Sequence, residues 1–194
     1  MREAVPSDEK LVAQVREGDA EAFGRLVRKH QDYVYNAVYH MVGDDQDAED
    51  LAQEVFVRAY NGLAGFEARA RFTTWLYGIL LNTVRSYWRR QARRSVVSLG
   101  FDGDEPNEPG AQLPAEDAGP LEAALQNEEI RMVRRAIGEL EDELREIIVL
   151  RDMQGLPYDE LAEALRIPAG TVKSRLHRAR GRLKEKLEDF FDQK

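Results

Sequence analysis

Residues 158–187 read YDELAEALRIPAGTVKSRLHRARGRLKEKL and predict two helices joined by a tight turn. A short helix covers 158–165, the turn 166–170 contains Pro168, and a long helix runs from 171 to about 187. The long helix carries one apolar stripe at helical spacing, formed by Val172, Leu176, Ala179, Leu183 and Leu187. Two helices with this connection have helix-turn-helix geometry.

The long helix is basic on the sides that the stripe leaves free. Residues 166–186 hold eight Lys and Arg side chains and one acid. The first turns of such a helix enter the major groove of DNA, where Arg and Lys reach guanine edges. The candidate base contacts are Lys173, Ser174, His177 and Arg178. The competing interpretation is a solvated amphipathic helix with no DNA partner.

The other apolar patterns are also helical, and we find no strand-like alternation. In the N-terminal half, Asp8 and Asp19 are predicted to cap the first two helices, and Gly18 and Gly43 to end them. A third helix starts at Asp44 or Asp45 and ends at Asn61-Gly62, and a fourth covers 72–94. Two further helices are expected over about 121–138 and 141–153. The fold prediction is all-α with two domains.

The fourth helix combines aromatic and basic side chains, as a surface for unpaired bases does. Residues 69–94 contain seven arginines and no acid. Its core stripe is predicted to be Phe72, Trp75, Leu76, Ile79, Leu80, Val84 and Tyr87. The opposite face carries Tyr77, Leu81, Asn82, Arg85 and Trp88, with Arg89 beside it. We expect Trp75 in the core and Trp88 exposed; alternatively, both are core residues and the arginines only solvate the helix.

The third helix is acidic, with six carboxylates and no base in residues 44–54. A calcium-binding EF-hand is excluded, because its turn glycine would be Asp50 and its closing glutamate Phe56. Asp47, Asp50 and Glu54 share one helical face, and Gln53 lies beside it. This face is either a docking surface for a basic partner or a solvated helix N-terminus.

Charge is distributed unevenly along the 194 residues, whose net charge is −8. Residues 96–128 hold eight acids and no Lys or Arg, so they carry the whole net charge. This segment is also rich in Pro and Gly, and we predict a flexible acidic linker. It separates a domain at 1–95 from a domain at 129–194, whose first helix starts near residue 121.

Catalytic and membrane functions find no support in the pattern. The chain has no cysteine, its three histidines are scattered, and no nucleophile, P-loop or zinc motif occurs. His30 lies on an apolar stripe, so we expect it to be packed. No apolar run is long enough to span a membrane, and the first residues lack a secretory signal. We expect a cytoplasmic protein with no catalytic residue, cofactor or metal.

Three strings in order resemble bacterial RNA polymerase sigma factors of the extracytoplasmic-function branch of the sigma-70 family. They are DAEDLAQEVFVRAY at 47–60, FTTWLY at 72–77 with Asn82, and GTVKSRLHRAR at 170–180. The resemblance implies a four-helix region 2 domain and a helix-turn-helix region 4 domain joined by a flexible linker. It implies core RNA polymerase and promoter DNA as partners, and commonly an anti-sigma factor.

The resemblance also implies roles for residues. Asp50, Gln53 and Glu54 would dock on the clamp helices of the largest polymerase subunit, and the flap is a further polymerase contact. The fourth helix and the loop at 62–71 would melt and read the −10 element as a single strand. The −10 residues are Asn82, which would contact a flipped base, with Trp75, Tyr77, Arg85, Trp88 and Arg89. The duplex −35 element would meet Lys173, Ser174, His177 and Arg178, with Arg175 and Arg180 nearer phosphates.

The chain departs from the family at Gly78 and Leu81, where many members carry a basic residue, and His177 occupies a variable recognition position. Two other functions remain open. An ordinary helix-turn-helix regulator with a helical sensor domain would bind duplex DNA without polymerase. A helical adaptor that binds only protein would tolerate the loss of Lys173 and Arg178.

Overall fold

The computed structural model describes residues 6–67, 70–98 and 120–192, and these ranges contain helices and turns but no strand. The all-α prediction is confirmed. The N-terminal elements are α1 (Asp8–Arg16), α2 (Ala20–Val42), α3 (Asp45–Gly62), the 3₁₀ turn η1 (Leu63–Gly65) and α4 (Phe72–Ser98). The C-terminal elements are α5 (Pro120–Gly138), α6 (Asp142–Ile148), the π-helical turn η2 (Val149–Met153), α7 (Tyr158–Leu165) and α8 (Ala169–Asp192).

Local capping explains the starts of α1, α2 and α3 and the end of α2. Asp19 caps α2 by accepting two backbone N–H bonds, and Gly43 ends it with a left-handed φ of 81°. Asp44 caps α3, which resolves the alternative left open in the sequence. The expected cap of α1 was wrong. Ser7 has the extended backbone that a cap requires and accepts from the third helical residue, so Asp8 is already inside the helix.

Asp8 instead fixes α1 to α2. Its carboxylate lies 2.7 Å from Lys29 Nζ and 3.1 Å from Nε2 of the buried His30. Burial acts to raise the pKa of Asp8, but the hydrogen bonds from these two side chains outweigh it and lower the pKa. The expectation of a packed histidine is therefore confirmed.

The C-terminal domain is built around α6 and the turn that follows it. The apolar run Ile147 to Leu150 is buried on all sides, between α8 and the N-terminal helices. The helix expected over 141–153 is in fact α6 followed by η2. The connection between α7 and α8 passes through Arg166 in a left-handed conformation, with φ of 57°. The helix-turn-helix prediction is confirmed, although α8 starts two residues earlier than expected.

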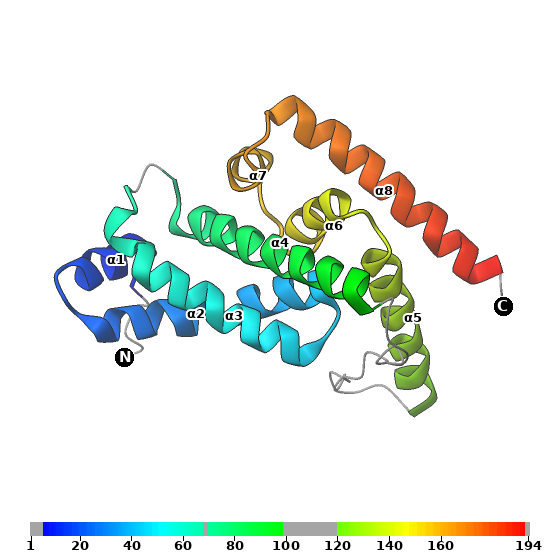
Figure 1. Cartoon of the computed structure of the whole chain (residues 1–194), viewed down its shortest axis with the longest axis horizontal. Helices are drawn as coiled ribbons and strands as arrows, with labels where there is room; N and C mark the ends of the chain where they lie inside the picture. Colours follow the sequence, from blue (N-terminus) through cyan, green and yellow to red (C-terminus); the bar gives the residue numbers. More distant parts are fainter. Residues whose placement is uncertain (1–5, 68–69, 99–119, 193–194) are drawn as a thin grey trace.

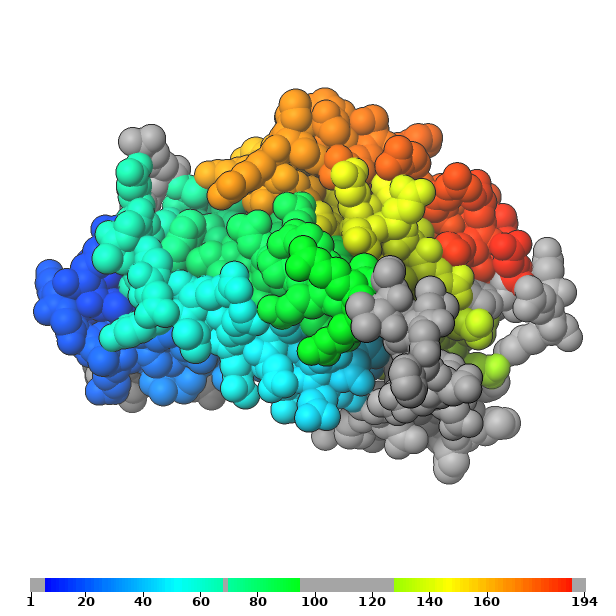
Figure 2. Space-filling model, in the orientation of Figure 1, coloured from blue at the N-terminus to red at the C-terminus, as the bar shows by residue number. Residues whose placement is uncertain are grey.

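The two helical groups pack against each other, and their buried apolar residues form one continuous cluster. α7 lies on α4, and α5 and η2 lie on α2. Figure 1 shows α6, α7 and α8 above α4, with α5 beside the end of α4 at the right, and Figure 2 shows the same arrangement of α7 and α8 as a surface. Most of the linker predicted over 96–128 falls on residues 99–119, which lie outside the described residues. The next helix, α5, begins at Pro120. None of the helices described combines the length and apolar character needed to cross a membrane.

Candidate nucleic-acid and protein interfaces

The outer face of α8 presents four of the predicted base contacts together. Lys173, Ser174, His177 and Arg178 are exposed on one side of the helix. On the opposite side, Val172, Leu176 and Ala179 of the predicted apolar stripe are buried in the core and Leu183 packs against it; α8 contacts α5, α6 and α7. In Figure 1 this helix lies at the edge of the molecule, with no other helix covering its outer side. The geometry permits insertion of the first turns into a major groove.

The two predicted phosphate contacts of α8 lie elsewhere. Arg175 turns toward α6, where its guanidinium is 2.8 Å from Glu143 and largely covered. Arg180 stays exposed and forms a two-bonded pair with Asp152 of η2, at 2.6 and 3.0 Å. The hydrogen bond from Arg180 to this carboxylate raises the pKa of the guanidinium. Of these two arginines, only Arg180 is exposed, and its guanidinium is paired with Asp152.

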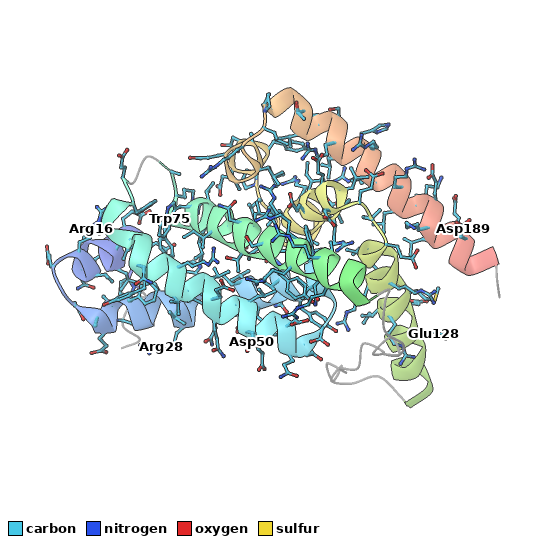
Figure 3. The ribbon with its side chains drawn as sticks, viewed as in Figure 1. Arg16, Arg28, Asp50, Trp75, Glu128 and Asp189 are labelled. Carbon is cyan, nitrogen blue, oxygen red and sulfur yellow. The ribbon has the colours of Figure 1, made fainter. Side chains whose placement is uncertain are left out.

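The acidic face of α3 is open to solvent. Asp50 and Gln53 are exposed and Glu54 is partly exposed. In Figure 3, Asp50 points away from the C-terminal helices. Glu54 accepts from Arg58 of the next turn at 3.0 and 2.5 Å. Asp47 does not belong to this face, because its carboxylate accepts a 2.6 Å bond from the Tyr87 hydroxyl of α4.

Two large apolar residues extend the acidic face and were missed in the sequence. Val57 is 60% exposed and Tyr60 is 50% exposed. Val57 follows Asp50 by seven residues and Glu54 by three, which is helical spacing. The sequence alone could therefore have placed Val57 on the acidic face. An exposed apolar centre beside carboxylates is typical of a protein-docking surface rather than of a solvated helix.

The predicted strand-binding face of α4 is mostly covered, which contradicts the expected exposure. Tyr77 is 8% exposed and Leu81 is 1% exposed, whereas Asn82 and Arg89 remain at the surface. The Tyr77 hydroxyl lies 3.3 Å from Oε1 of Gln154 in the C-terminal domain. Burial, with the charge of Tyr33 as a smaller cause, raises the pKa of Tyr77 to about 12.

Trp88 and Trp75 have different surroundings. Trp88 was expected to be exposed, but it is half-buried, with the guanidinium of Arg145 5.0 Å from its ring centre. Trp75 was expected in the core, but it is also only partly buried; it packs on Phe66 and Phe72 at the edge of the core, with ring centres 5.0 and 5.8 Å apart. The error at Trp88 arose because other helices pack on two sides of α4, the N-terminal helices α2 and α3 on one and the C-terminal domain on the other, and not on one side only.

Both ends of the covered face of α4 bind carboxylates of the C-terminal domain. Arg85 donates from Nε and Nη2 to the two oxygens of Glu146, both at 2.6 Å. These bonds raise the pKa of Arg85. Glu160 accepts from Arg71 and from the Thr74 hydroxyl, both at 2.8 Å. The glutamates and Thr74 were not predicted as site residues, because only the packing of the two domains brings them to α4.

Arg145 is a further residue that the sequence did not reveal. It donates to the carbonyl oxygens of Ile137, Leu140 and Met41 at 3.3, 2.9 and 3.0 Å. It also donates to Gly138 O at 2.5 Å. Burial lowers the pKa of its guanidinium. Arg145 thus supplies hydrogen-bond donors to the backbone carbonyl oxygens at the end of α5. Its bond to Met41 O also connects the end of α5 to the end of α2.

Among the residues that the structure describes, no group of three or more His, Cys, Asp or Glu side chains is placed to hold a metal ion. The open surfaces instead offer hydrogen bonds, charge and apolar contact. Such surfaces suit binding to macromolecules.

Comparison with known proteins decides the family. A model of sigma-70 region 2 matches residues 26–94, and a model of sigma-70 region 4 matches 130–183. The ECF RNA polymerase sigma factor SigW of Bacillus subtilis is 35% identical over 93% of this chain and 97% of its own. The ECF RNA polymerase sigma-E factor of Escherichia coli K12 is 38% identical over 95% and 96%. The chain belongs to the extracytoplasmic-function sigma factors. It is thus a DNA-binding protein of transcription initiation.

Solved structures show the same fold in relatives of this sigma factor. CnrH, in complex with the cytosolic domain of CnrY, is 28% identical and has a TM-score of 0.70 over 95% of this chain and 99% of its own. The sigma factor RpoE of Bartonella quintana, in complex with the anti-sigma factor NepR, is 26% identical. Its TM-score is 0.70 over 87% of this chain and 98% of its own.

Proposed function

We propose that this sigma factor binds core RNA polymerase and directs it to promoters that carry −35 and −10 elements. The observation that carries the proposal is the presence of two open faces of opposite chemistry. The acidic and apolar face of α3 suits a protein, and the basic face of α8 suits DNA. Figures 1 and 3 show them on different sides of the molecule, so both can be engaged together.

The face of α3 is the proposed polymerase contact. Asp50, Gln53 and Glu54 supply charge and hydrogen bonds, and Val57 and Tyr60 supply apolar area. Such a face fits the clamp helices of the largest polymerase subunit, which the family resemblance implies. We place a second polymerase contact, with the flap, in the C-terminal domain.

The DNA contacts divide between the domains. On α8, Lys173, Ser174, His177 and Arg178 face the −35 duplex, and Arg180 is near its backbone. On α4, Asn82 and Arg89 are accessible for the −10 strand. Melting of the −10 region by α4 also needs its covered residues, namely Trp75, Tyr77, Arg85 and Trp88.

We also propose control by an anti-sigma factor. The sigma factor RpoE of Bartonella quintana was solved with the anti-sigma factor NepR, and CnrH, of the same fold, with the cytosolic domain of CnrY; each matches most of this chain. A partner of this kind would act by covering the α3 face or the α8 face.

Reversal of charge on α3 tests the polymerase contact. Asp50→Lys with Glu54→Lys should abolish binding to core polymerase and promoter-directed transcription, while leaving duplex binding intact. The matched control is Glu21→Lys with Asp32→Lys, the same charge change at exposed positions of α2. Normal polymerase binding by the α3 variant would refute the proposal and favour an ordinary helix-turn-helix regulator.

A further inference from the structure

The turn between α6 and α7 places a carboxylate beside α8. Asp152 lies in the π-helical turn η2, whose bond from Gln154 N to Val149 O, at 3.0 Å, spans five residues instead of the four of an α-helix. Such turns occur frequently at functional sites. Asp152 accepts from Nε and Nη2 of Arg180 at 3.0 and 2.6 Å, although 28 residues separate the two in the chain. The turn therefore connects Asp152 to the helix whose outer face is proposed for DNA.

The turn that carries Asp152 is itself fixed. Residues 149 and 150 at its start are buried in the core. Arg151, directly before Asp152, donates to Leu156 O at 2.7 Å. Its guanidinium also lies over the ring of Tyr158, 4.9 Å from the ring centre. Asp152 is thus presented from an element that is held on both sides, so the pair with it restricts the conformations of the Arg180 side chain.

The pair with Asp152 leaves one edge of the Arg180 guanidinium available. A guanidinium has five N–H donors, and Asp152 takes one from Nε and one from Nη2. The remaining N–H groups, on Nη1 and Nη2, form the end-on edge of the fork, which can bind a phosphate through two hydrogen bonds. The Arg180 side chain is 53% exposed. Arg180 is therefore held in one position and still accessible from solvent.

The other arginine expected near phosphates has the opposite arrangement. Arg175 lies 2.8 Å from Glu143 of α6, but its side chain is only 16% exposed. Glu143 is 62% exposed, so in this pair the carboxylate faces solvent and the arginine is covered. The two pairs have the same chemistry and both connect α8 to the preceding segment. They differ in whether the cation is open to a ligand, and this difference makes Glu143 a matched control for Asp152.

Two effects of Asp152 on DNA binding oppose each other. Its charge repels phosphates, and an exposed charge about 7 Å from a phosphate weakens binding by about twofold after screening by salt. Its hydrogen bonds order the Arg180 side chain before DNA binds. Ordering a free arginine on binding lowers the affinity by up to about tenfold, because the side chain loses rotamer entropy. The ordering effect is the larger of the two, and the net effect of Asp152 is about fivefold tighter binding.

We propose that Asp152 is a positioning residue for the −35 duplex, which holds Arg180 with its end-on edge directed to a phosphate. The inference rests on the proposed −35 role of α8. Asp152 acts through Arg180 and not by its own contact with DNA. Because a phosphate contact carries no sequence information, Asp152 sets the affinity of the chain for duplex DNA and leaves its sequence preference unchanged.

The test measures binding of the full chain to duplex DNA by fluorescence anisotropy. One labelled probe is a duplex that the unsubstituted chain selects from a random library, and the other is a duplex of random sequence. The variant is Asp152→Ala. The control is Glu143→Ala, which removes the same charge and an ion pair with α8, but whose arginine is covered. Circular dichroism and urea denaturation check that each variant is folded.

Asp152→Ala should weaken binding to both duplexes by about fivefold, although it removes a negative charge close to the DNA. Glu143→Ala should bind at least as tightly as the unsubstituted chain, because only a repulsive charge is lost. Both variants should select the same sequence as the unsubstituted chain. Equal or tighter binding by Asp152→Ala would overturn the inference, and so would an equal loss in the control.

A double substitution separates positioning from a structural role. Arg180→Ala should weaken binding at least as much as Asp152→Ala, and should lower the slope of log affinity against log salt concentration by about one. Adding Asp152→Ala to Arg180→Ala should cause no further loss. A further fivefold loss would show that Asp152 acts through the fold of the domain, and the inference would be wrong.

Two results distinguish this inference from the proposed function. If the unsubstituted chain selects no sequence from the random library, the −35 role of α8 fails and the inference fails with it. If a sequence is selected but Arg180→Ala leaves the affinity unchanged, only the inference fails.

Discussion

Arg145→Ala is the substitution whose effect on stability can be worked out most fully from the structure. Arg145 donates to Ile137 O and Leu140 O at the end of α5, and to Met41 O of α2. It also stacks on Trp88. Ile137 O also accepts from Leu140 N at 3.1 Å, whereas Arg145 is the donor to Leu140 O and Met41 O outside the helices' own hydrogen bonds in the described residues.

Each buried carbonyl left without its donor costs about 1–3 kcal/mol, and the loss of the aromatic contact costs about 1 kcal/mol. Water reaching the vacated site offsets part of this cost. We therefore expect the free energy of unfolding to fall by about 3 kcal/mol, with a loss of about 6–12 °C in Tm. Urea denaturation followed by circular dichroism measures the first quantity, and calorimetry the second.

The matched control is Arg135→Ala, on the neighbouring helix. Arg135 is exposed and pairs with Glu139 one turn away at 3.3 Å. Exposed pairs of this kind contribute about 0.3–0.5 kcal/mol. If the two variants differ by less than about 0.5 kcal/mol in the free energy of unfolding, the proposed role of Arg145 is wrong.

Three further predictions concern pH and the two open faces. Burial, with a smaller effect from the charge of Arg134, lowers the pKa of His40 from 6.5 to about 4. The folded state thus favours neutral His40. The contribution of neutral His40 to the free energy of unfolding is therefore fully present above about pH 6.5, where His40 is neutral in the unfolded chain as well. We expect it to be lost as pH falls toward 4, by about 1–2 kcal/mol after allowance for partial exposure. Urea titrations should show a flatter pH dependence for His40→Gln, and an unchanged slope would contradict this. Arg178→Ala should weaken −35 duplex binding by about 1–3 kcal/mol and relax specificity at one base pair, as selection from random duplexes would reveal. A uniform loss over all sequences would instead indicate a phosphate contact. Val57→Asp should weaken polymerase binding in a pull-down with core enzyme without lowering Tm, because the side chain is exposed; retained binding would exclude Val57 from the interface.

Local chemistry made much of the fold predictable. The caps Asp19 and Asp44, the stop at Gly43 and the apolar stripe of α8 are all encoded within a few residues of where they act. The exposed acidic face of α3, apart from Asp47, and the exposed basic side of α8 were predictable for the same reason. Each depends on one helix with one buried side.

The covered face of α4 was not predictable in this way. The sequence interpretation assumed one buried side, so Tyr77 and Trp88 were assigned to solvent, although the C-terminal domain covers them. No local pattern links Arg85 to Glu146, which is 61 residues away along the chain. One signal was present, because Glu146 precedes the apolar run Ile147 to Leu150. A carboxylate beside a segment buried on all sides requires a cationic partner.

The central claim is that this sigma factor selects promoters through two elements read by different helices. The most direct measurement is the sequencing of transcripts made in vitro by core polymerase and this protein from a library of random DNA. The account predicts that the start sites share two upstream sequence elements at a fixed spacing. It also predicts that Arg178→Ala alters only the distal element and Asn82→Ala only the proximal one. Start sites without a shared element, or transcripts independent of the protein, would contradict the account.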